Sequence, residues 1–388
     1  MSYRRRSRWM IVAITATAVV GLAGCSSGGT STNKATPGDP ASAALVNEAK
    51  TQLAADRDQP TFGTPGPSLN AASLKGKQVL VVAHDQNSAE LVGIAKGIQA
   101  AGDAAGVTIN LFNGNGSVSA IQQGMTQGIQ QHVGAIILDG VATDLITSSL
   151  TAAAQAQVPV VTVVDSQPDP AKPGQGAGEH VFGNIEPPYY KFGQLMAYTA
   201  IEATGGKVQA AVLTFNNPIA DAAVAGLNSV LLKCSGCKVV ATQNIEPSAW
   251  STDVPRDTAA AIRSNPGLNY VFPAVDSMGI FATTGVRQAG SSAKVHVVSS
   301  DGSGEGALSL VKKGDVFVAD PGSSPAWLGW ATLDQVMRGM LKMAPATPTV
   351  PHRYLDSATL ASVDVSNSAA VYGASFEAGY KKLWGIGS

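Results

Sequence analysis

The sequence predicts an α/β protein built from two doubly wound, Rossmann-like lobes. Short apolar runs alternate with amphipathic helical patterns from Gln78 onward, and this alternation restarts after a stretch rich in proline and glycine. Runs that are apolar on both faces are typical of parallel strands covered by helices on each side. The chain has 388 residues, of which 45% are hydrophobic, so it is long enough to bury two such cores.

The first series of elements lies between residues 78 and 165. Its strands are expected at QVLVVA, VTINLF, GAIILD and VPVVTVVD. Helices are expected between them, at residues 89–106, 118–132 and 143–157, because apolar residues recur there three or four positions apart.

The second series begins after the segment SQPDPAKPGQGAGEHVFGNIEPP. Its strands are expected at KVQAAVLTF, KVVATQ, LNYVFPAVD, AKVHVVSSD and DVFVAD. The helices are expected at residues 189–206, 220–233, 257–267, 277–290 and 304–314. A last helix at 326–342 precedes the run TVPHRYLD, so the chain returns to the sheets after the second series.

The N-terminus has the pattern of an export signal. Four arginines stand in the first eight residues without an acid, and an uncharged apolar run extends to Gly24. This run is too short to span a bilayer, which takes about 20 apolar residues. The tetrapeptide Leu22-Ala23-Gly24-Cys25 resembles the lipobox of bacterial lipoproteins. That resemblance implies cleavage before Cys25, fatty acylation of its sulfur (palmitate is one such chain) and anchoring to the outer face of the cell membrane.

An ordinary signal peptide with an incidental cysteine is the alternative interpretation of this segment. Removing residues 1–24 deletes four arginines and no acid, so the net charge changes from −1 to −5. The remaining chain has no basic block, which disfavours binding to nucleic acid, because phosphate neutralisation needs clustered Lys and Arg.

Cys234 and Cys237 form a C-x-x-C motif in LLKCSGCKVV. The motif follows a helical pattern and precedes a strand, whereas a thioredoxin-type motif opens a helix after a strand. No second cysteine pair is present to complete a zinc site. In an exported protein we expect a disulfide at this turn, with redox chemistry as the alternative.

Polar side chains follow most of the predicted strands, and Asp139 itself ends the third of them. In open α/β sheets ligands bind beyond the carboxyl ends of the strands, so we expect these side chains to converge. Carboxylates and amides accept hydrogen bonds from hydroxyls, and aromatic faces stack on sugar rings. The candidate ligand-binding residues are His84, Asp85, Asn87, Asp165, Asn216, Asn217, Trp250, Asp276, Asp301 and Asp320.

Each candidate also has an explanation that needs no ligand. Asp276 and Asp301 precede predicted helices and could cap them. Trp250 could pack on the surface of a lobe, and the pair Asn216-Asn217 could form a turn. His84 is an isolated histidine, which we expect to form hydrogen bonds rather than to bind a metal.

The order of these motifs resembles the type I periplasmic solute-binding proteins, especially the ribose-binding-like group, over about residues 78–364. The segments that carry the resemblance are YVFPAVDSMGIFATTGVRQAG, VHVVSSDGSGEG, PVVTVVDSQ and ATQNIEPSAWSTD. The resemblance implies two lobes joined by a three-crossing hinge near VFGNIEP, FVADPGSS and TVPHRYL. It places the following residues near the cleft between the lobes: Asp165, Asn217, Trp250, Asp276 and Asp301.

The chain departs from the ribose-like pattern at several positions. Ala89 and Glu90 stand where paired aromatic residues are expected, and Ser166 stands in place of an arginine. A second expected arginine is absent near Asp221, and Val275 replaces an asparagine. Because arginines supply paired donors to hydroxyls, these changes support the architecture more than a simple pentose or hexose ligand.

The function expected from this resemblance is capture of a sugar or sugar-like polyol and its delivery to the permease of an ABC transporter. Alternatives are a sensor subunit that presents its ligand to a membrane receptor, and a binder of a less polar metabolite. The sequence contains no nucleophile elbow, H-E-x-x-H motif, P-loop or dinucleotide fingerprint, so we expect neither an enzyme nor a cofactor. We expect a monomer whose partners are the small ligand, the permease and the membrane.

The resemblance and the composition together predict the division of the chain. We expect a signal peptide at 1–24 and a lipid-anchored linker with a short helix at 25–75. We expect the first lobe at 76–183 plus 321–348, the second lobe at 184–320 plus 349–365, and a C-terminal extension at 366–388.

Overall fold

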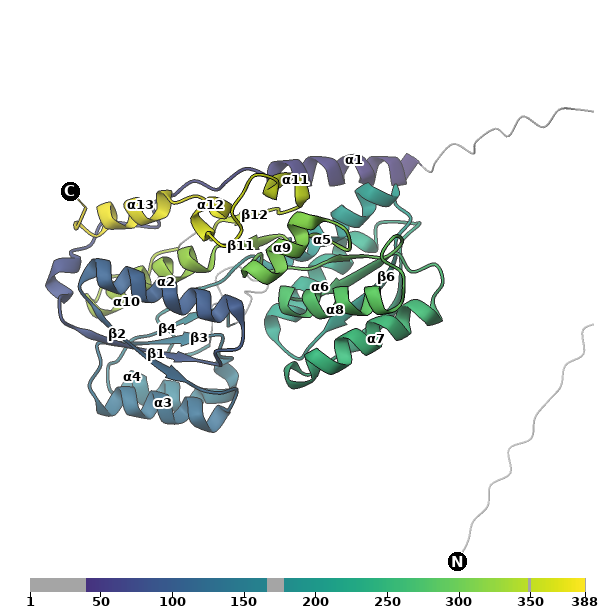
Figure 1. The fold of residues 1–388 in the computed structure, drawn as a ribbon. Helices are drawn as coiled ribbons and strands as arrows, with labels where there is room; N and C mark the ends of the chain where they lie inside the picture. Colours follow the sequence, from purple (N-terminus) through teal and green to yellow (C-terminus); the bar gives the residue numbers. More distant parts are fainter. Residues whose placement is uncertain (1–39, 166–177, 348–349, 388) are drawn as a thin grey trace, which may run out of the picture. The chain divides into compact units, whose positions relative to one another are not determined.

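The structure, a computed structural model, describes residues 40–165, 178–347 and 350–387 (Figure 1). The signal sequence and Cys25 lie outside the described residues. Among the helices described, none has the length and apolar character needed to cross a membrane.

The first sheet is parallel and has the strand order β2-β1-β3-β4-β5. Its strands are β1 (Gln78–Ala83), β2 (Thr108–Asn113), β3 (Ala135–Asp139), β4 (Val160–Val163) and β5 (Gly183–Ile185). The helices that pack around it are α2 (Ala89–Ala105), α3 (Val118–Gln130), α4 (Thr147–Gln155), which follows the 3-10 turn η2 (Thr143–Ile146), and α10 (Pro325–Met340). We call this sheet with these helices the first lobe.

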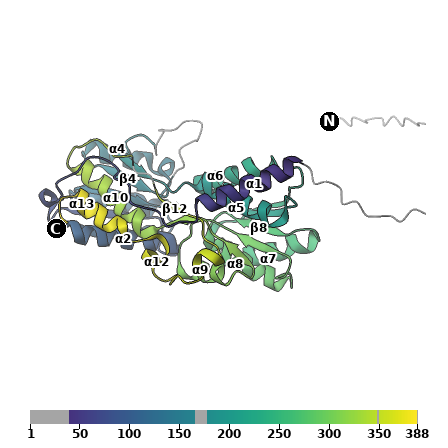
Figure 2. The ribbon, with the colours of Figure 1, turned by 90° about the horizontal axis from the view of Figure 1, so that it is seen from above.

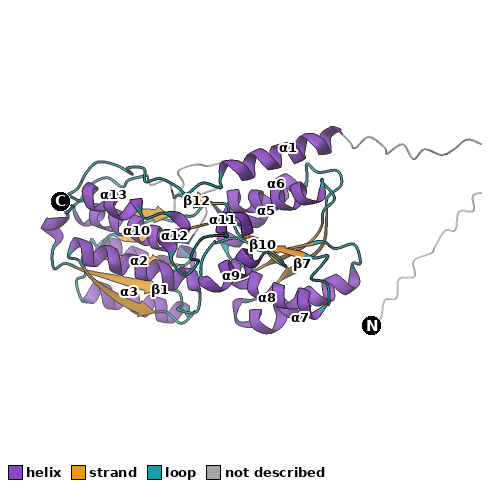
Figure 3. Cartoon of the chain, turned by 45° about the horizontal axis from the view of Figure 1, so that its top comes forward, coloured by secondary structure: helices purple, strands orange, loops and turns teal. Residues whose placement is uncertain are grey.

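The second sheet is also parallel, with the order β10-β9-β8-β6-β7. Its strands are β6 (Gln209–Thr214), β7 (Lys238–Asn244), β8 (Tyr270–Pro273), β9 (His296–Val298) and β10 (Phe317–Ala319). The helices of this second lobe are α5 (Tyr189–Thr204), α6 (Pro218–Leu231), α7 (Trp250–Ser264), which follows η3 (Pro247–Ala249), α8 (Asp276–Gln288) and α9 (Glu305–Lys313). Figure 3 shows the strands of both sheets in orange among the purple helices.

The predicted fold class is confirmed, because two five-stranded parallel sheets are each flanked by helices. The apolar runs are the strands: β1, β3 and β4 are buried along nearly their whole length. Strand β5 was not predicted, and it spans the predicted lobe boundary at residues 183 and 184. Helix α7 begins at Trp250, earlier than the predicted start at residue 257.

Three segments carry the chain between the lobes, in the places that the sequence predicted. The first runs from β5 to α5, and the second runs from β10 through β11 (Gly322–Ser323) to α10. The third returns from α10 through β12 (His352–Arg353) to α11 (Ser357–Leu360), which packs on α9. Strands β11 and β12 pair antiparallel with each other, which ties the second crossing to the third.

The segments outside the two sheets are packed against them. Helix α1 (Pro40–Ala55) lies along α5 and buries Leu45, Ala49 and Leu53 in the core of the second lobe (Figure 2). The chain then passes through η1 (Ala71–Leu74) into β1. The C-terminal helices α12 (Ser368–Tyr372) and α13 (Ser375–Leu383) follow, and α13 packs on α10 and α2. The predicted linker thus contains a helix that belongs to the folded core.

Candidate functional site

The carboxyl ends of the strands in both sheets carry acidic residues. In the first sheet β3 ends at Asp139, and α2, which follows β1, carries Glu90 in its first turn. In the second lobe Asp276 begins α8 after β8, and Asp301 and Asp320 follow β9 and β10. We call Glu90, Asp139, Asp276, Asp301 and Asp320 the carboxyl cluster.

All five members of the carboxyl cluster are buried, and none is more than 5% exposed. Neighbouring members act on one another electrostatically. The charge of Asp276 raises the pKa of Glu90, and the charge of Glu90 raises the pKa values of Asp139 and Asp301. Because Glu90 and Asp139 belong to the first lobe and the other three to the second, the cluster joins residues of both lobes.

Two direct contacts bring the lobes together beside the cluster. The hydroxyl of Tyr189, at the start of α5, lies 3.1 Å from each carboxylate oxygen of Glu90. Gly304 lies against Ala89, and a Cβ atom at Gly304 would come within 2.9 Å of the Ala89 methyl group. A large aromatic residue at Ala89, as in the ribose-like pattern, would therefore meet the 301–304 loop.

Asp276 is held by the loop that follows β9. Its Oδ2 atom accepts hydrogen bonds from the Ser303 backbone N–H at 3.0 Å and from the Ser303 hydroxyl at 2.9 Å. Its own N–H donates to Asp301 Oδ2 at 3.4 Å. These bonds fix the Asp276 carboxylate between two strand ends.

Neither Asp276 nor Asp301 acts as the helix cap that the alternative interpretation required. The N-cap residue of α8 is Val275 and that of α9 is Gly304, and neither cap is closed by a side-chain hydrogen bond. Capping therefore does not account for these two acids, and contact with a ligand stays a prediction for both.

The backbone at Asp301 has a φ angle of 108°, which non-glycine residues rarely adopt. The surroundings hold it there: a Cβ atom at Gly322 would lie 1.9 Å from the Asp301 carbonyl oxygen. The Tyr372 hydroxyl donates to the neighbouring carbonyl of Gly302 at 2.7 Å. Strained backbone of this kind is concentrated at functional sites, where the surrounding structure maintains it.

Burial raises the pKa of every carboxyl group in the cluster. For Glu90, desolvation and the nearby Asp276 raise the pKa to about 8. Desolvation also raises the pKa of Asp276, to about 7, although the Ser303 donors oppose it. The pKa values of Asp139, Asp301 and Asp320 are raised well above the usual range by burial and by their acidic neighbours.

Asp165 lies at the carboxyl end of the first sheet, after β4. Its Oδ1 accepts from the Thr143 backbone N–H at 3.1 Å, and its own N–H donates to Glu186 at 2.7 Å. Burial raises its pKa to about 6. These contacts connect Asp165 to η2 of its own lobe and to the first crossing, and its convergence with Asp276 and Asp301 stays a prediction.

The aromatic candidate, Trp250, lies at the start of α7 and is half-buried. Its indole N–H donates to the Ile245 carbonyl at 2.9 Å, and its ring meets that of Phe215 edge-on at 5.1 Å. One role of Trp250 is therefore to hold the turn between β7 and α7. Stacking on a ligand remains a prediction.

The remaining candidates take part in local turns. Asn217 caps α6 through the Ile219 N–H, and the exposed Asn216 bonds to Glu246. The Asp85 carboxylate pairs with His84 at 2.8 Å and accepts from the Asn87 and Ser88 N–H groups. These bonds lower the pKa of Asp85, with His84 as the largest cause. His84 and Asn217 thus have local structural roles of the kind that the alternative interpretation offered.

Glu90, Tyr189 and Tyr372 are not among the candidate residues that the sequence indicates. Glu90 lies in the first turn of a helix, where an acidic residue is common and draws no attention. The sequence offered one indication of a role in the site, which is that Glu90 stands where the ribose-like pattern has an aromatic residue. Tyr189 and Tyr372 lie in segments whose packing depends on the chain crossings, so no local pattern could identify them.

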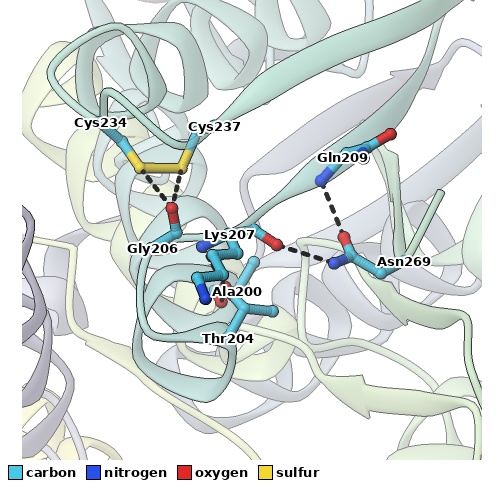
Figure 4. Close-up of a disulfide and its surroundings, with 8 residues drawn as sticks. All are labelled: Ala200, Thr204, Gly206, Lys207, Gln209, Cys234, Cys237 and Asn269. Carbon is cyan, nitrogen blue, oxygen red and sulfur yellow. Dashed lines mark hydrogen bonds between the residues drawn. A yellow bond between two sulfur atoms is a disulfide. The ribbon is translucent and has the colours of Figure 1, made fainter. Parts of the chain in front are cut away.

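Cys234 and Cys237 lie away from the cluster, in the turn between α6 and β7 (Figure 4). Their sulfur atoms are at bonding distance, 2.07 Å, and Cys234 Sγ lies 3.3 Å from the Gly206 carbonyl oxygen. The position of the two cysteines agrees with the predicted structural role at a turn. Formation of the disulfide in the exported protein stays a prediction. Among the described residues there is no group of His, Cys, Asp and Glu arranged to hold a metal ion.

Comparison with known proteins gives a family for this arrangement. Residues 69–339 match the model of a family described as periplasmic binding protein domain. No curated protein sequence matches the chain significantly.

The solved structures most similar to the chain include several transporter components. A solute-binding protein of an ABC transporter from Agrobacterium vitis, solved with α-D-tagatopyranose, has 21% identity and a TM-score of 0.65 over 75% of this chain and 98% of its own. Another from Actinobacillus succinogenes, solved with D-allose, has 20% identity and a TM-score of 0.64 over 73% of this chain and 98% of its own. A third from Thermotoga lettingae, solved with 5-methylthioribose, has 17% identity and a TM-score of 0.66 over 77% of this chain and 92% of its own. At these identities the likeness establishes a shared fold.

Proposed function

Because the chain belongs to the periplasmic binding protein domain family, we propose that it captures a small polar molecule between its two lobes. The proposed ligand is a sugar or a sugar-like polyol, and the proposed recipient is the permease of an ABC transporter. The structural neighbours support the ligand class, since three of them were solved with tagatopyranose, allose and 5-methylthioribose.

The observation that carries this proposal is the carboxyl cluster, which lies at the carboxyl ends of strands from both sheets. Ligands of open α/β sheets bind at that edge. A buried acid is costly unless it is paired or hydrogen-bonded, yet the cluster brings Glu90 of one lobe close to Asp276 and Asp301 of the other. Stability does not explain why the chain keeps these acidic groups together, whereas binding of a ligand does.

The proposed mechanism is hinge closure at the three crossings. The Glu90–Tyr189 hydrogen bonds and the contact of Ala89 with Gly304 join the lobes in the present conformation. Opening the hinge would break both contacts and expose the cluster to water. A ligand that binds both lobes favours the closed conformation, which the permease would recognise.

The proposed location is the outer face of the cell membrane, through acylation of Cys25. The lipobox-like tetrapeptide Leu22-Ala23-Gly24-Cys25 supports this location, and residues 26–39, rich in Ser, Gly and Thr, would then join the anchor to α1. One acylated terminus with two chains satisfies the rule that stable anchoring takes two signals.

The test is a screen of the purified protein against neutral sugars, polyols, cyclitols and less polar metabolites. A ligand should raise the melting temperature and reduce the radius of gyration measured by small-angle X-ray scattering. If the tightest ligand proves to be apolar, the proposed ligand class is wrong. A ligand that binds without any change in the radius of gyration would contradict hinge closure.

A further inference from the structure

The carboxyl cluster has an unusual balance of charge for a site that binds a neutral sugar. The charged groups that most affect the pKa values of Glu90, Asp139, Asp301 and Asp320 are all acidic. In the part of the chain that the structure describes, no recorded salt bridge includes a member of the cluster. The cluster therefore has acceptors without a neighbouring cation.

Arg353, whose charge affects the pKa of the Tyr372 hydroxyl, is bonded to backbone atoms instead of to the cluster. Arg353 donates to the carbonyl oxygens of Arg57, at 2.8 Å, and of Val371. These bonds hold the N-terminal and C-terminal segments to β12 and use the guanidinium group on backbone atoms. The sequence also lacks the two arginines of the ribose-like pattern, with Ser166 at one of the positions.

Several buried oxygens of this region have no hydrogen-bond partner among the described residues. They include both carboxylate oxygens of Asp139. The oxygens of Asp320 and Oδ1 of Asp301 also have no bond of normal geometry, although the Gly302 N–H and the Tyr189 hydroxyl lie close enough to lower the pKa values of Asp320 and Asp301 respectively. The Ser323 hydroxyl, which is not acidic, is also unpartnered and only 2% exposed, and its backbone N–H donates to the Asp301 carbonyl. Buried polar atoms of native proteins are nearly always bonded, so these atoms indicate a ligand rich in donors.

Hydroxyl groups meet this need poorly. A neutral polyol supplies donors but nothing that favours ionisation of carboxyl groups whose pKa values are raised, whereas an ammonium group supplies three donors and a positive charge that stabilises the ionised carboxylates. We propose that the ligand of this site is a small cationic polyol, such as an amino sugar or an aminocyclitol, with its ammonium group held by the carboxyl cluster. This inference rests on the proposed function and specifies its ligand class.

The experiment uses pairs of ligands that differ in one group. The probes are D-glucamine with D-glucitol, D-glucosamine with D-glucose, and scyllo-inosamine with scyllo-inositol, set within the wider screen of neutral compounds. Each amine is also tested as its N-acetyl derivative, which keeps the shape and removes the charge. Dissociation constants are measured by isothermal titration calorimetry at pH 7. We expect at least one amine to bind ten times more tightly than its hydroxyl partner and its N-acetyl derivative.

A matched pair of variants tests the role of the cluster. Asp301→Asn keeps the shape of the side chain, and asparagine tolerates the positive φ angle at this position. The control, Asp103→Asn, changes an exposed carboxyl group near the end of α2 that is opposite to Glu90. We expect Asp301→Asn to weaken amine binding at least tenfold and Asp103→Asn to leave it unchanged. Equal effects of the two variants would overturn the role given to the cluster.

The outcomes separate this inference from the proposed function. If neutral sugars or polyols bind as tightly as their amine partners, the cationic ligand is wrong and the solute-binding function stands. If no sugar, polyol or amine in the screen binds, both proposals fail.

Discussion

The hydroxyl of Tyr189 on α5 lies 3.1 Å from both carboxylate oxygens of Glu90 on α2, so a donor of the second lobe meets a buried acid of the first. This contact is the basis of the first prediction. Tyr189→Phe leaves the Glu90 carboxyl group buried without its donor, which should cost about 1–3 kcal/mol in the free energy of unfolding. Urea denaturation measures this change. Tyr190→Phe, at the half-buried neighbour on the same helix, is the control, and an equal loss in both variants would contradict the role of the bond.

The second prediction concerns pH. The pKa of Glu90 is raised to about 8, so the folded protein holds a proton that the unfolded chain releases near pH 4.5. The stability of the ligand-free protein should therefore fall as the pH rises from about 4.5 to about 8. Asp276, Asp301, Asp320 and Asp139 have raised pKa values and act in the same direction, while the Tyr189 hydroxyl opposes the shift at Glu90.

Melting temperatures measured across this pH range test the prediction. Glu90→Gln removes one titrating group from the carboxyl cluster and should make the fall with pH shallower. Asp103→Asn should not change it, because this carboxyl group is exposed. A stability that stays constant over the same interval would show that the cluster carboxyls ionise in the folded protein as they do in the unfolded chain, and a rise would show that folding lowers their pKa values.

The third prediction separates two roles of Trp250. Trp250→Phe keeps an aromatic face but loses the N–H bond to the Ile245 carbonyl, so stability should fall by about 1 kcal/mol while ligand affinity is kept. Trp250→Ala should lose ligand affinity as well, if the ring stacks on the ligand. Thermal melts and calorimetry on both variants supply the two quantities. Unchanged affinity in Trp250→Ala would leave Trp250 with its structural role alone.

The fourth prediction concerns the C-terminal extension. Trp384 is fully buried, stacks on Trp330 at 5.2 Å, and donates to Asp334, which pairs with the buried Arg338. Trp384→Ala should therefore cost about 3–5 kcal/mol in the free energy of unfolding. Leu232→Ala, at an exposed residue, is the control. A loss below about 1 kcal/mol for Trp384→Ala would show that the extension is not part of the folded core.

The fifth prediction concerns the anchor. Cys25→Ala removes the only cysteine near the N-terminus and should move the protein from the membrane fraction to the soluble fraction. Its melting temperature should not change, because Cys234 and Cys237, which lie in the folded body, are untouched. Immunoblots of fractionated cells provide the measurement. A protein that stays with the membrane after this substitution is held there by something other than the lipobox-like cysteine.

Much of the fold could be predicted from the sequence, because local periodicity and strand burial are linked. Runs such as QVLVVA have no polar face, so they had to become buried parallel strands between helices. The same logic placed Asp276, Asp301 and Asp320 at one edge of a sheet, because parallel strands end together. The pattern could not reveal β5, whose three residues pair with β4 only through the chain crossing.

The site shows where the information in the sequence ends. By itself the sequence determined two doubly wound lobes and the acids that end their strands, since both follow from the period of side chains along the chain. Only the tertiary structure decided that Glu90 lies beside Asp276 and Tyr189, and that Tyr372 reaches Gly302, 70 residues away in sequence. These contacts depend on how three crossings bring the lobes together, and the desolvation that raises the pKa values exists only once that packing has excluded water.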